Sequence, residues 1–405
     1  MRAFLAALFA LGSLQGQSFY NYVGQVEAHS VLLAWGTIGP QGNTIGRASV
    51  PMGNAVVRIA NRAIPATQNW LLVDGLSPDT SYPYQIDING QRRGGGQVRT
   101  WPEAATHMCF FVIGDFGNGS SGQQAVASLM SRELQRKVTS DCPVRFVLTV
   151  GDNIYADATL GVSVKSGDED AHWQRKFFEP YVDVLRQVPF LPTLGNHDGN
   201  GSENRADLAT YLDNFFFPQN RPARWYTFTY AGLAQFFALD STINSAIGPT
   251  TPAYAPQGAQ SVWLRDAMGA SQAPWKIPYF HNPVYNAGPR HGNAYDELKH
   301  WVELFERSGV KVVFAGHEHN FQFTNARDTG GITYVISGSG GELRPGDVRR
   351  KMAAQHIAGW APFRQFLSVE IEGDQMRIVP LSPEPLSVVD RDKHPVKLPV
   401  TQSLH

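Results

Sequence analysis

The stretch VKVVFAGHEHNF, Val310 to Phe321, places two histidines and a glutamate directly after an apolar run. A short apolar run bounded by glycine is typical of a buried β-strand. The two imidazoles at its end have two explanations. One is a metal site, and the other is a polar loop that contains His317 and His319 by chance. The rest of the chain decides between them.

The pattern of a buried strand followed by polar residues recurs in the second part of the chain. Apolar runs alternate with segments of helical period, for example CFFVIGD, QQAVASLMSRELQRKV and VRFVLTVGD. Strands that are apolar throughout and separated by amphipathic helices indicate sheets with helices on both faces. We therefore expect an α/β domain of layered β-sheets flanked by helices, over residues 102–389.

Almost every predicted strand of this domain ends in a side chain that can bind a metal. In an α/β sheet, ligands bind beyond the carboxyl ends of the strands. Taken singly, each donor has an ordinary explanation as a helix cap, a turn residue or a core histidine. Burying all of them at one edge of one sheet would be costly without cations. The donors are Asp115, Asp152, Tyr155, Asn196, His281, His317 and His319.

The number and the kinds of donors point to two ions. Seven oxygen and nitrogen donors exceed what one imidazole-containing site can use, whereas two sites that share a carboxylate would each be nearly filled. Tyrosine must lose a high-pKa proton to bind, which favours a hard trivalent ion beside Tyr155. The imidazole-rich position suits a borderline divalent ion.

Residues 17–101 predict a different kind of domain. Segments such as VLLAWG and TSYPYQIDIN alternate apolar and polar residues between Gly, Pro and Asn clusters, which is typical of a small β-sandwich. LSPDTSYPY, Leu76 to Tyr84, resembles the corner of fibronectin type III domains, where a tyrosine hydroxyl bonds back to the backbone. We expect Trp35 in the core of this sandwich. The glycine-rich stretch from Arg92 to His107 is expected to lead out of it.

The two ends of the chain carry further predictions. Residues 1–16 have the outline of a secretory signal peptide, with Arg2 followed by an apolar stretch too short to span a bilayer. The alternative is a buried N-terminal helix. Export predicts a secreted or periplasmic protein with no membrane attachment once the signal is removed. Residues 390–405 are charged and lack periodicity, so we expect a loosely held tail.

Charge and cysteine content limit the partners and the compartment. The formal net charge is −1, which argues against a nucleic-acid partner bound by bulk electrostatics. An anionic substrate would need concentrated positive charge, such as bound cations. Cys109 and Cys142 precede two apolar runs, and they form either a disulfide or two buried free thiols.

Five motifs in order resemble those of the purple acid phosphatases, within the metallophosphoesterases. They are Asp115-Phe-Gly117, Gly151-Asp-Asn-Ile-Tyr155, Gly195-Asn-His-Asp198, His281 in PYFHNP, and Gly316-His-Glu-His319. The resemblance spans Cys109 to Asn320, and the sandwich before it resembles the N-terminal domain of the family's larger members. One motif departs from the pattern, because Pro278 stands where the family usually has valine. Proline lacks the N–H that a central strand needs, which affects the placement of His281.

The resemblance implies a role for each donor. An Fe(III) would be held by Asp115, Asp152, Tyr155 and His319. A second ion, iron, zinc or manganese, would be held by Asp152, Asn196, His281 and His317, with Asp152 bridging. The resemblance further implies that His197 contacts the substrate and protonates the leaving alkoxide, and His291 looks like the second substrate-contacting histidine. We expect Glu318 to support the ligands or to be solvated, and Asp198 and Asn153 to orient them.

Together these inferences predict a secreted binuclear-metal phosphatase of the acid phosphatase type. It would hydrolyse small-molecule phosphate monoesters by attack of a metal-bound hydroxide. One alternative is a phosphodiesterase or nucleotide-cleaving enzyme on the same metal core. Another is a secreted binding protein without activity, although the complete ligand set argues against it.

Overall fold

The computed structural model describes residues 18–39, 42–155, 158–159, 162–163, 173–198, 208–242 and 254–405. The predicted signal peptide, residues 1–16, lies outside these ranges. Within them, no helix combines the length and the apolar character that a membrane span requires.

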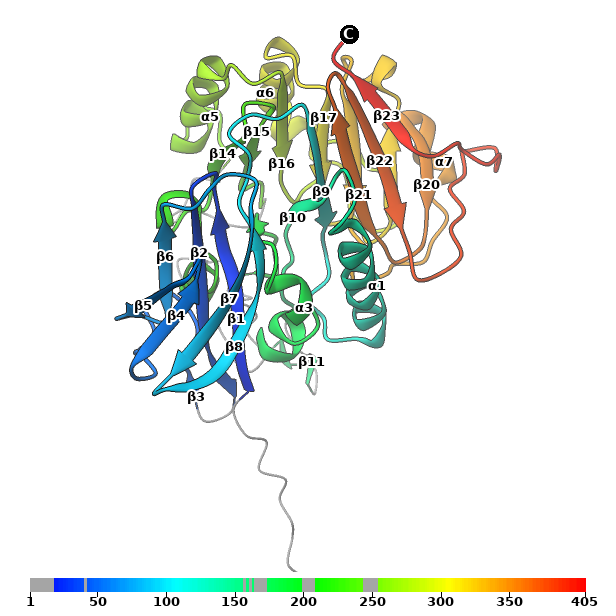
Figure 1. Cartoon of the computed structure of the whole chain (residues 1–405). Helices are drawn as coiled ribbons and strands as arrows, with labels where there is room; N and C mark the ends of the chain where they lie inside the picture. Colours follow the sequence, from blue (N-terminus) through cyan, green and yellow to red (C-terminus); the bar gives the residue numbers. More distant parts are fainter. Residues whose placement is uncertain are drawn as a thin grey trace, which may run out of the picture.

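The N-terminal part consists of two antiparallel sheets, drawn in blue and cyan in Figure 1. In one sheet β2 pairs with β1 on one side and with β3 and β6 on the other. The second sheet has the order β5-β4-β7-β8. The strands are β1 Ser18–Val26, β2 Ser30–Gly39, β3 Gly42–Asn43, β4 Ala55–Ile59, β5 Arg62–Ala66, β6 Trp70–Asp74, β7 Ser81–Ile88 and β8 Gln91–Arg99.

The core and the corner of this part agree with the sequence. Trp35 is fully buried, as predicted, and shares a core with Val57 of β4 and Ile86 of β7. In the loop between β6 and β7, the backbone N–H of Ser77 donates to the hydroxyl of Tyr82 over 2.8 Å. The tyrosine corner predicted from Leu76 to Tyr84 is therefore formed.

The second part contains two mixed β-sheets. The first has the order β13-β10-β9-β21-β22-β23 and the second the order β14-β15-β16-β17-β19-β18-β20. Their strands are β9 His107–Ile113, β10 Val144–Thr149, β13 Phe190–Pro192, β14 Tyr226–Tyr230, β15 Ala234–Ala238, β16 Trp275–Tyr279, β17 Val312–Ala315, β18 Phe321–Thr324, β19 Thr333–Ser337, β20 Ile357–Ala361, β21 Phe366–Glu372, β22 Gln375–Leu381 and β23 Val400–Ser403; the short strands β11 Ala158–Thr159 and β12 Val162–Ser163 pair with each other.

The two mixed sheets pack against each other through aromatic side chains. The rings of Phe110 on β9 and Phe146 on β10 lie 5.4 and 5.2 Å from that of Phe236 on β15. The expectation that all donor-bearing strands belong to one sheet is therefore wrong, because β16 and β17 lie in the second sheet. The central strands are covered by the other sheet on one face and by helices on the other. Both kinds of cover require apolar residues, so the sequence does not distinguish them.

Helices cover the outer faces of the two sheets. On α6, Tyr295–Arg307, three apolar residues pack in one core with Phe280, which follows β16, and with Val313 of β17; they are Leu298, Trp301 and Phe305. On the other side α1 begins at the N-cap Ser120 and buries its apolar face in the main core. The helices are α1 Ser121–Lys137, α3 Val182–Leu185, α4 Ala209–Asn214, α5 Ala259–Ala270, α6 Tyr295–Arg307 and α7 Arg349–Met352, and a π-helical turn spans Gln174–Phe178.

The C-terminal residues are not a loose tail. Strand β23, Val400–Ser403, pairs antiparallel with β22 and completes the edge of the first sheet. Before it, Val389 forms bridges to Trp360 and to Pro395. The prediction of a loosely held tail is therefore wrong. Backbone hydrogen bonds hold this segment, and they do not require the apolar periodicity on which the prediction depended.

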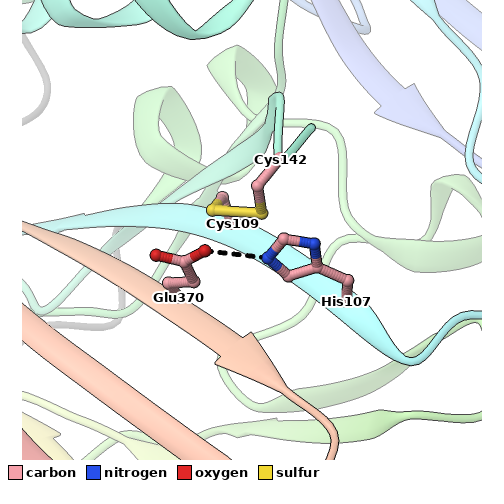
Figure 2. A group of neighbouring side chains, drawn as sticks. All are labelled: His107, Cys109, Cys142 and Glu370. Atoms are coloured by element: carbon pink, nitrogen blue, oxygen red, sulfur yellow. Dashed lines mark hydrogen bonds and ion pairs between the residues drawn. A yellow bond between two sulfur atoms is a disulfide. The ribbon is translucent and has the colours of Figure 1, made fainter. Parts of the chain in front are cut away.

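The two cysteines form a disulfide, which excludes the free-thiol alternative. Figure 2 shows the bond beside the side chains of His107 and Glu370, whose Nε2 and Oε1 lie 2.8 Å apart. Cys109 lies on β9 and Cys142 just before β10, and these strands are parallel neighbours. The disulfide therefore joins two strands at the end of the sheet opposite to the metal-competent donors.

Candidate metal centre

The centre is formed by the residues that directly follow β9, β10, β13, β16 and β17. Three of them have positive φ angles, 55° at Asp115, 51° at Asp152 and 70° at His317. Residues other than glycine rarely adopt this conformation, and it persists where the surrounding structure enforces it, commonly at functional sites. The backbone at these strand ends is therefore set by the site and not by local preference.

Two glycines allow the strand ends to approach one another closely. A Cβ atom on Gly195 would lie 2.2 Å from Oδ1 of Asp152, and one on Gly316 would lie 2.5 Å from Oδ2 of Asp115. Both distances are far below van der Waals contact, so neither position accepts a side chain. This agrees with the glycine that follows the apolar run in the opening stretch of sequence.

One group of donors comes from three separate loops. Oδ1 of Asp115 lies 3.2 Å from the hydroxyl of Tyr155, Nε2 of His319 lies 3.3 Å from that hydroxyl, and Asp115 and His319 are 3.3 Å apart at the same atoms. All three side chains are buried. They surround a common point, as the sequence predicts.

A second group surrounds Nε2 of His281. This atom lies 3.0 Å from Oδ1 of Asn196, 3.1 Å from Nδ1 of His317 and 3.4 Å from Oδ2 of Asp152. Nδ1 of His281 donates its proton to the carbonyl of Val150 over 2.8 Å, which turns Nε2 toward the other donors. A metal-binding histidine is commonly oriented in this way by a carbonyl.

The spacing within both groups fits bound ions. An ion about 2.0–2.2 Å from each ligand holds neighbouring donors roughly 2.8–3.6 Å apart at tetrahedral or octahedral angles. The contacts just described are 3.0–3.4 Å. Ligand atoms of Asp115, Asp152 and His281 also lie within 4.8 Å of one another, so the two groups adjoin. The described residues therefore fit two neighbouring cations with Asp152 between them.

The pKa shifts of the donors show that the centre lacks positive charge to balance its oxygens. Burial raises the pKa of Tyr155 well above its usual value, and the charges of Asp115 and Asp152 raise it further. Burial also raises the pKa of Asp115. Burial opposes ionisation of Asp152 too, but His281 and His197 hold its pKa well below the usual range. A cation would relieve the repulsion among these oxygens and favour the deprotonated forms that bind metals.

A proton can partly take the place of a cation at His281. Burial lowers the pKa of this imidazole, but the charge and hydrogen bond of Asp152 outweigh burial and raise the pKa to about 9. Nε2 of a protonated His281 would donate to the acceptors around it. A metal ion bound there displaces this proton, because only neutral imidazole binds metals.

The sequence of this part matches a family model. Residues 108–321, which contain all five predicted motifs, match the calcineurin-like phosphoesterase family. The chain belongs to that family. Membership makes it a hydrolase of the metallophosphoesterase superfamily, for which a binuclear metal centre is expected.

Relatives of this phosphoesterase agree with the resemblance seen in the motifs. It is 26% identical over 285 residues to purple acid phosphatase 3 of Arabidopsis thaliana, covering 67% of this chain and 74% of that one. It is 27% identical over 261 residues to the tartrate-resistant acid phosphatase type 5 of Oryctolagus cuniculus, covering 60% and 77%. A solved purple acid phosphatase from yellow lupin seeds has the same fold, with a TM-score of 0.68 at 13% identity, covering 96% of this chain and 74% of that one.

The placement of His281 follows the prediction despite Pro278. Strand β16 pairs with β15 over five residues, and Pro278 lies opposite Phe237. On its other side β16 pairs with β17 at one position only, Tyr279 with Phe314. The missing N–H is therefore accommodated by a short ladder to β17, and His281 still reaches the other donors of the phosphoesterase centre.

Two residues predicted to orient the ligands do so through the backbone. Asp198 is buried and accepts hydrogen bonds from the backbone N–H groups of Asn153 and Gly195, over 2.7 and 2.6 Å. The side-chain amide of Asn153 also donates to Asp198, over 3.0 Å. Burial and the nearby charge of Asp152 raise the pKa of Asp198 to about 7. These contacts tie the loop after β10 to the loop after β13.

Glu318 is a supporting residue and is not solvated. Its side chain is fully buried, and Oε2 accepts hydrogen bonds from the backbone N–H of His291, over 2.9 Å, and from the amide of Asn286, over 3.3 Å. The glutamate between the two histidines of the opening stretch therefore holds the loop that carries His291. Of the two alternatives that the sequence left for Glu318, a supporting residue is confirmed and a solvated one is excluded.

The two predicted substrate contacts lie beside the donors. His197 is exposed, its ring lies 4.6 Å from that of Tyr155, and its backbone N–H donates to Oδ1 of Asp152 over 2.8 Å. The ring of His291 stacks on that of His317 at 4.0 Å. Both imidazoles are therefore at the rim of the centre, where a substrate could reach them.

Sequence reasoning missed two cations near the centre. Arg344, in the loop after β19, contacts the ring of His291. Lys176 is fully buried on the π-helical turn, and its ammonium group donates to the backbone carbonyl of Tyr155. Neither residue follows a strand end that points at the centre, and neither belongs to one of the five motifs. No local signal in the sequence distinguishes them from other basic residues.

Proposed function

We propose that this protein hydrolyses phosphate monoesters at a binuclear metal centre, as an acid phosphatase. The observation that supports this most directly is the convergence of seven donors into two adjoining groups around Asp152, at ligand spacing. Sequence relatives named as acid phosphatases agree with it.

The proposed ligand sets follow the two groups of donors. Asp115, Tyr155 and His319 would hold an Fe(III) ion together with Asp152, because a phenolate favours a hard trivalent ion. Asn196, His281 and His317 would share Asp152 with a divalent iron, zinc or manganese ion. The two ions, when bound, supply Lewis-acid activation of water and neutralisation of phosphoryl charge.

The residues of the chain supply orientation and proton transfer. The hydrogen bond from the backbone of His197 to Asp152 ties that imidazole to the ligand between the two groups. From the rim, His197 would protonate the oxygen of the leaving alcohol, and His291 would lie beside the phosphoryl group. A side chain that acts as a general acid typically contributes about 10²–10⁴-fold to the rate.

Metal analysis and a phosphatase assay test the proposal together. We expect two transition-metal ions per chain, hydrolysis of an aryl monophosphate, and a visible charge-transfer band that Tyr155→Phe abolishes. The control is Tyr82→Phe, which removes a hydroxyl far from the centre. A colourless protein without transition metal would overturn the iron–phenolate assignment, and a metal-loaded protein inactive on monoesters would overturn the activity.

We also propose export and a fibronectin type III-like domain at residues 17–101, followed by the catalytic domain at residues 102–389. The Ser77–Tyr82 bond and the two antiparallel sheets support the fibronectin-like assignment. The disulfide is consistent with an oxidising compartment outside the cytoplasm. An N-terminal sequence of the mature protein that begins near Gln17 would support removal of a signal. Recovery of the intact N-terminus from the cytoplasm would contradict it.

A further inference from the structure

Arg344 lies at the rim of the metal centre, beside the ring of His291. Its backbone N–H donates to the carbonyl of His319 over 3.0 Å, which anchors the residue to a ligand loop. Its Nη1 atom lies 3.2 Å from Nε2 of His291 and 3.3 Å from Nδ1. The side chain is half-buried, and among the described residues no carboxylate lies within ion-pair distance of it.

The contacts of His291 determine which group faces a ligand. Nδ1 of His291 donates its proton to the carbonyl of His317 over 2.9 Å. The lone pair is then on Nε2, where it accepts a hydrogen bond from Arg344. The ring is further fixed by stacking on His317 and by the bond from its backbone to Glu318. The N–H of this imidazole is therefore used within the protein, and the guanidinium is the donor that remains.

A half-buried guanidinium without a carboxylate favours an anionic ligand. Taking a charge out of water is unfavourable unless an opposite charge compensates it. Guanidinium presents five N–H groups in a planar fork that matches the oxygens of phosphate, and such charge-assisted hydrogen bonds are about twice as strong as neutral ones. One of the five is occupied by His291, and the others, which have no partner among the described residues, can hold phosphoryl oxygens.

We propose that Arg344, positioned by His291, binds a terminal phosphoryl oxygen of the substrate and so selects phosphate monoesters over diesters. This rests on the proposed phosphatase function and names the residue behind its substrate class. A monoester has three terminal oxygens and close to two negative charges, whereas a diester has two oxygens and one charge. If two of the terminal oxygens face the two ion positions, only the monoester has a third terminal oxygen for Arg344.

The test compares four proteins in their metal-loaded form: wild type, Arg344→Ala, Arg344→Lys and Arg350→Ala. Arg350 is an exposed arginine on α7 and controls for loss of one positive charge. The measurements are the dissociation constant for inorganic phosphate and kcat/KM for an aryl monophosphate and a bis-aryl phosphate. Metal content and Tm of each variant show whether its fold and its centre are intact.

For Arg344→Ala we expect the phosphate dissociation constant and the monoester KM to rise about 10–100-fold, as for loss of hydrogen bonds to a charged group. Diester hydrolysis should change by less than about 3-fold, so the preference for monoesters falls. Arg344→Lys should recover part of the affinity, because it restores the charge without the fork. Arg350→Ala should behave as wild type.

Three results would overturn the inference. They are unchanged phosphate binding in Arg344→Ala, an equal loss for both esters, and an equal effect of Arg350→Ala. If wild type hydrolyses neither ester, the proposed function fails, and the phosphate measurement still decides whether Arg344 binds the anion. If Arg344→Ala loses its metals, Arg344→Lys is used in its place. An intermediate loss of phosphate affinity is then the expected result, and wild-type affinity would contradict the inference.

Discussion

Two polar regions of the molecule differ in whether groups of the chain itself pair with their polar side chains. In the interdomain contact, the amide of Asn21 donates to the hydroxyl of Tyr84, which donates to the carbonyl of Arg186, each over 2.9 Å. The same two parts of the chain also meet where Arg145 of β10 donates to the exposed carboxylate of Asp79 over 2.8 Å. Each of these three side-chain donors meets an acceptor within the chain.

The metal centre is built from similar residue types, but it has too few hydrogen-bond donors for its acceptors. Carboxylates, a phenol and imidazoles face one another at 3.0–3.4 Å, and few protons are available to join them. Tyr84 is paired with neutral groups, whereas the hydroxyl of Tyr155 donates to a carboxylate, and the charges of Asp115 and Asp152 raise its pKa and so oppose its ionisation. The difference indicates that the first region serves stability and that the second is kept for cations.

The largest expected effect comes from breaking the centre at its shared ligand. Asp152→Asn should reduce phosphatase activity to the level of the chelated wild type, because both ion positions lose a charged ligand. Chelation should lower the Tm of wild type, since ions that bind only the folded state stabilise it. It should leave the Tm of Asp152→Asn nearly unchanged. Calorimetry with and without chelator measures this.

The matched control for this prediction is Asp79→Asn in the interdomain contact. It removes a carboxylate that is also bonded to cationic side chains, but it should keep both the activity and the response of Tm to chelator. The distinction between the two regions would be wrong if chelation lowered the Tm of Asp152→Asn and Asp79→Asn equally. It would also be wrong if chelation lowered the Tm of none of the three proteins.

The second effect concerns the exposed rim of the centre. His197→Ala should lose about 10²–10⁴-fold in kcat for esters of poorly acidic alcohols and much less for aryl esters, because only a poor leaving group needs a general acid. Its metal content should equal that of wild type. The measurement is kcat across a series of leaving groups. A uniform loss across the series would show that His197 acts in binding or metal retention instead.

The positions of the donors along the chain were easier to predict from the sequence than their arrangement in space. The seven donors were predictable because each follows an apolar strand, and residues at the carboxyl ends of strands meet at one edge. Their division between two sheets was not, since apolar strands do not reveal what covers each face. Arg344 was not predictable either, because its contact with His291 depends on how two loops fold together. The tail showed the same limit, since its pairing with β22 uses the backbone alone.

The third effect tests whether the interdomain contact is complete without ions. Tyr84→Phe removes a hydroxyl that both accepts and donates, and leaves the Asn21 amide and the Arg186 carbonyl without that partner. We expect a loss of about 1–3 kcal/mol in the free energy of unfolding, as for unsatisfied buried polar groups. The loss should be the same with and without chelator, and phosphatase activity should not change. A loss seen only in the metal-loaded protein would instead couple the contact to the centre.

The smallest effect is a dependence on pH at Asp79. Burial raises the pKa of this carboxyl, but hydrogen bonds from Arg99 and Arg145 outweigh burial and lower it below the usual 3.8. A carboxyl whose pKa is lower in the folded state stabilises the protein above its unfolded pKa, and that contribution is lost as the pH falls through the folded value. Asp79→Asn should therefore be less stable than wild type at pH 7, by less than about 1 kcal/mol for so exposed a pair. Urea unfolding with chelator present throughout, so that metal loss does not contribute, should show the difference shrinking below about pH 4. A difference that stays constant down to pH 3 would mean that the contact depends on shape and not on the charge of Asp79.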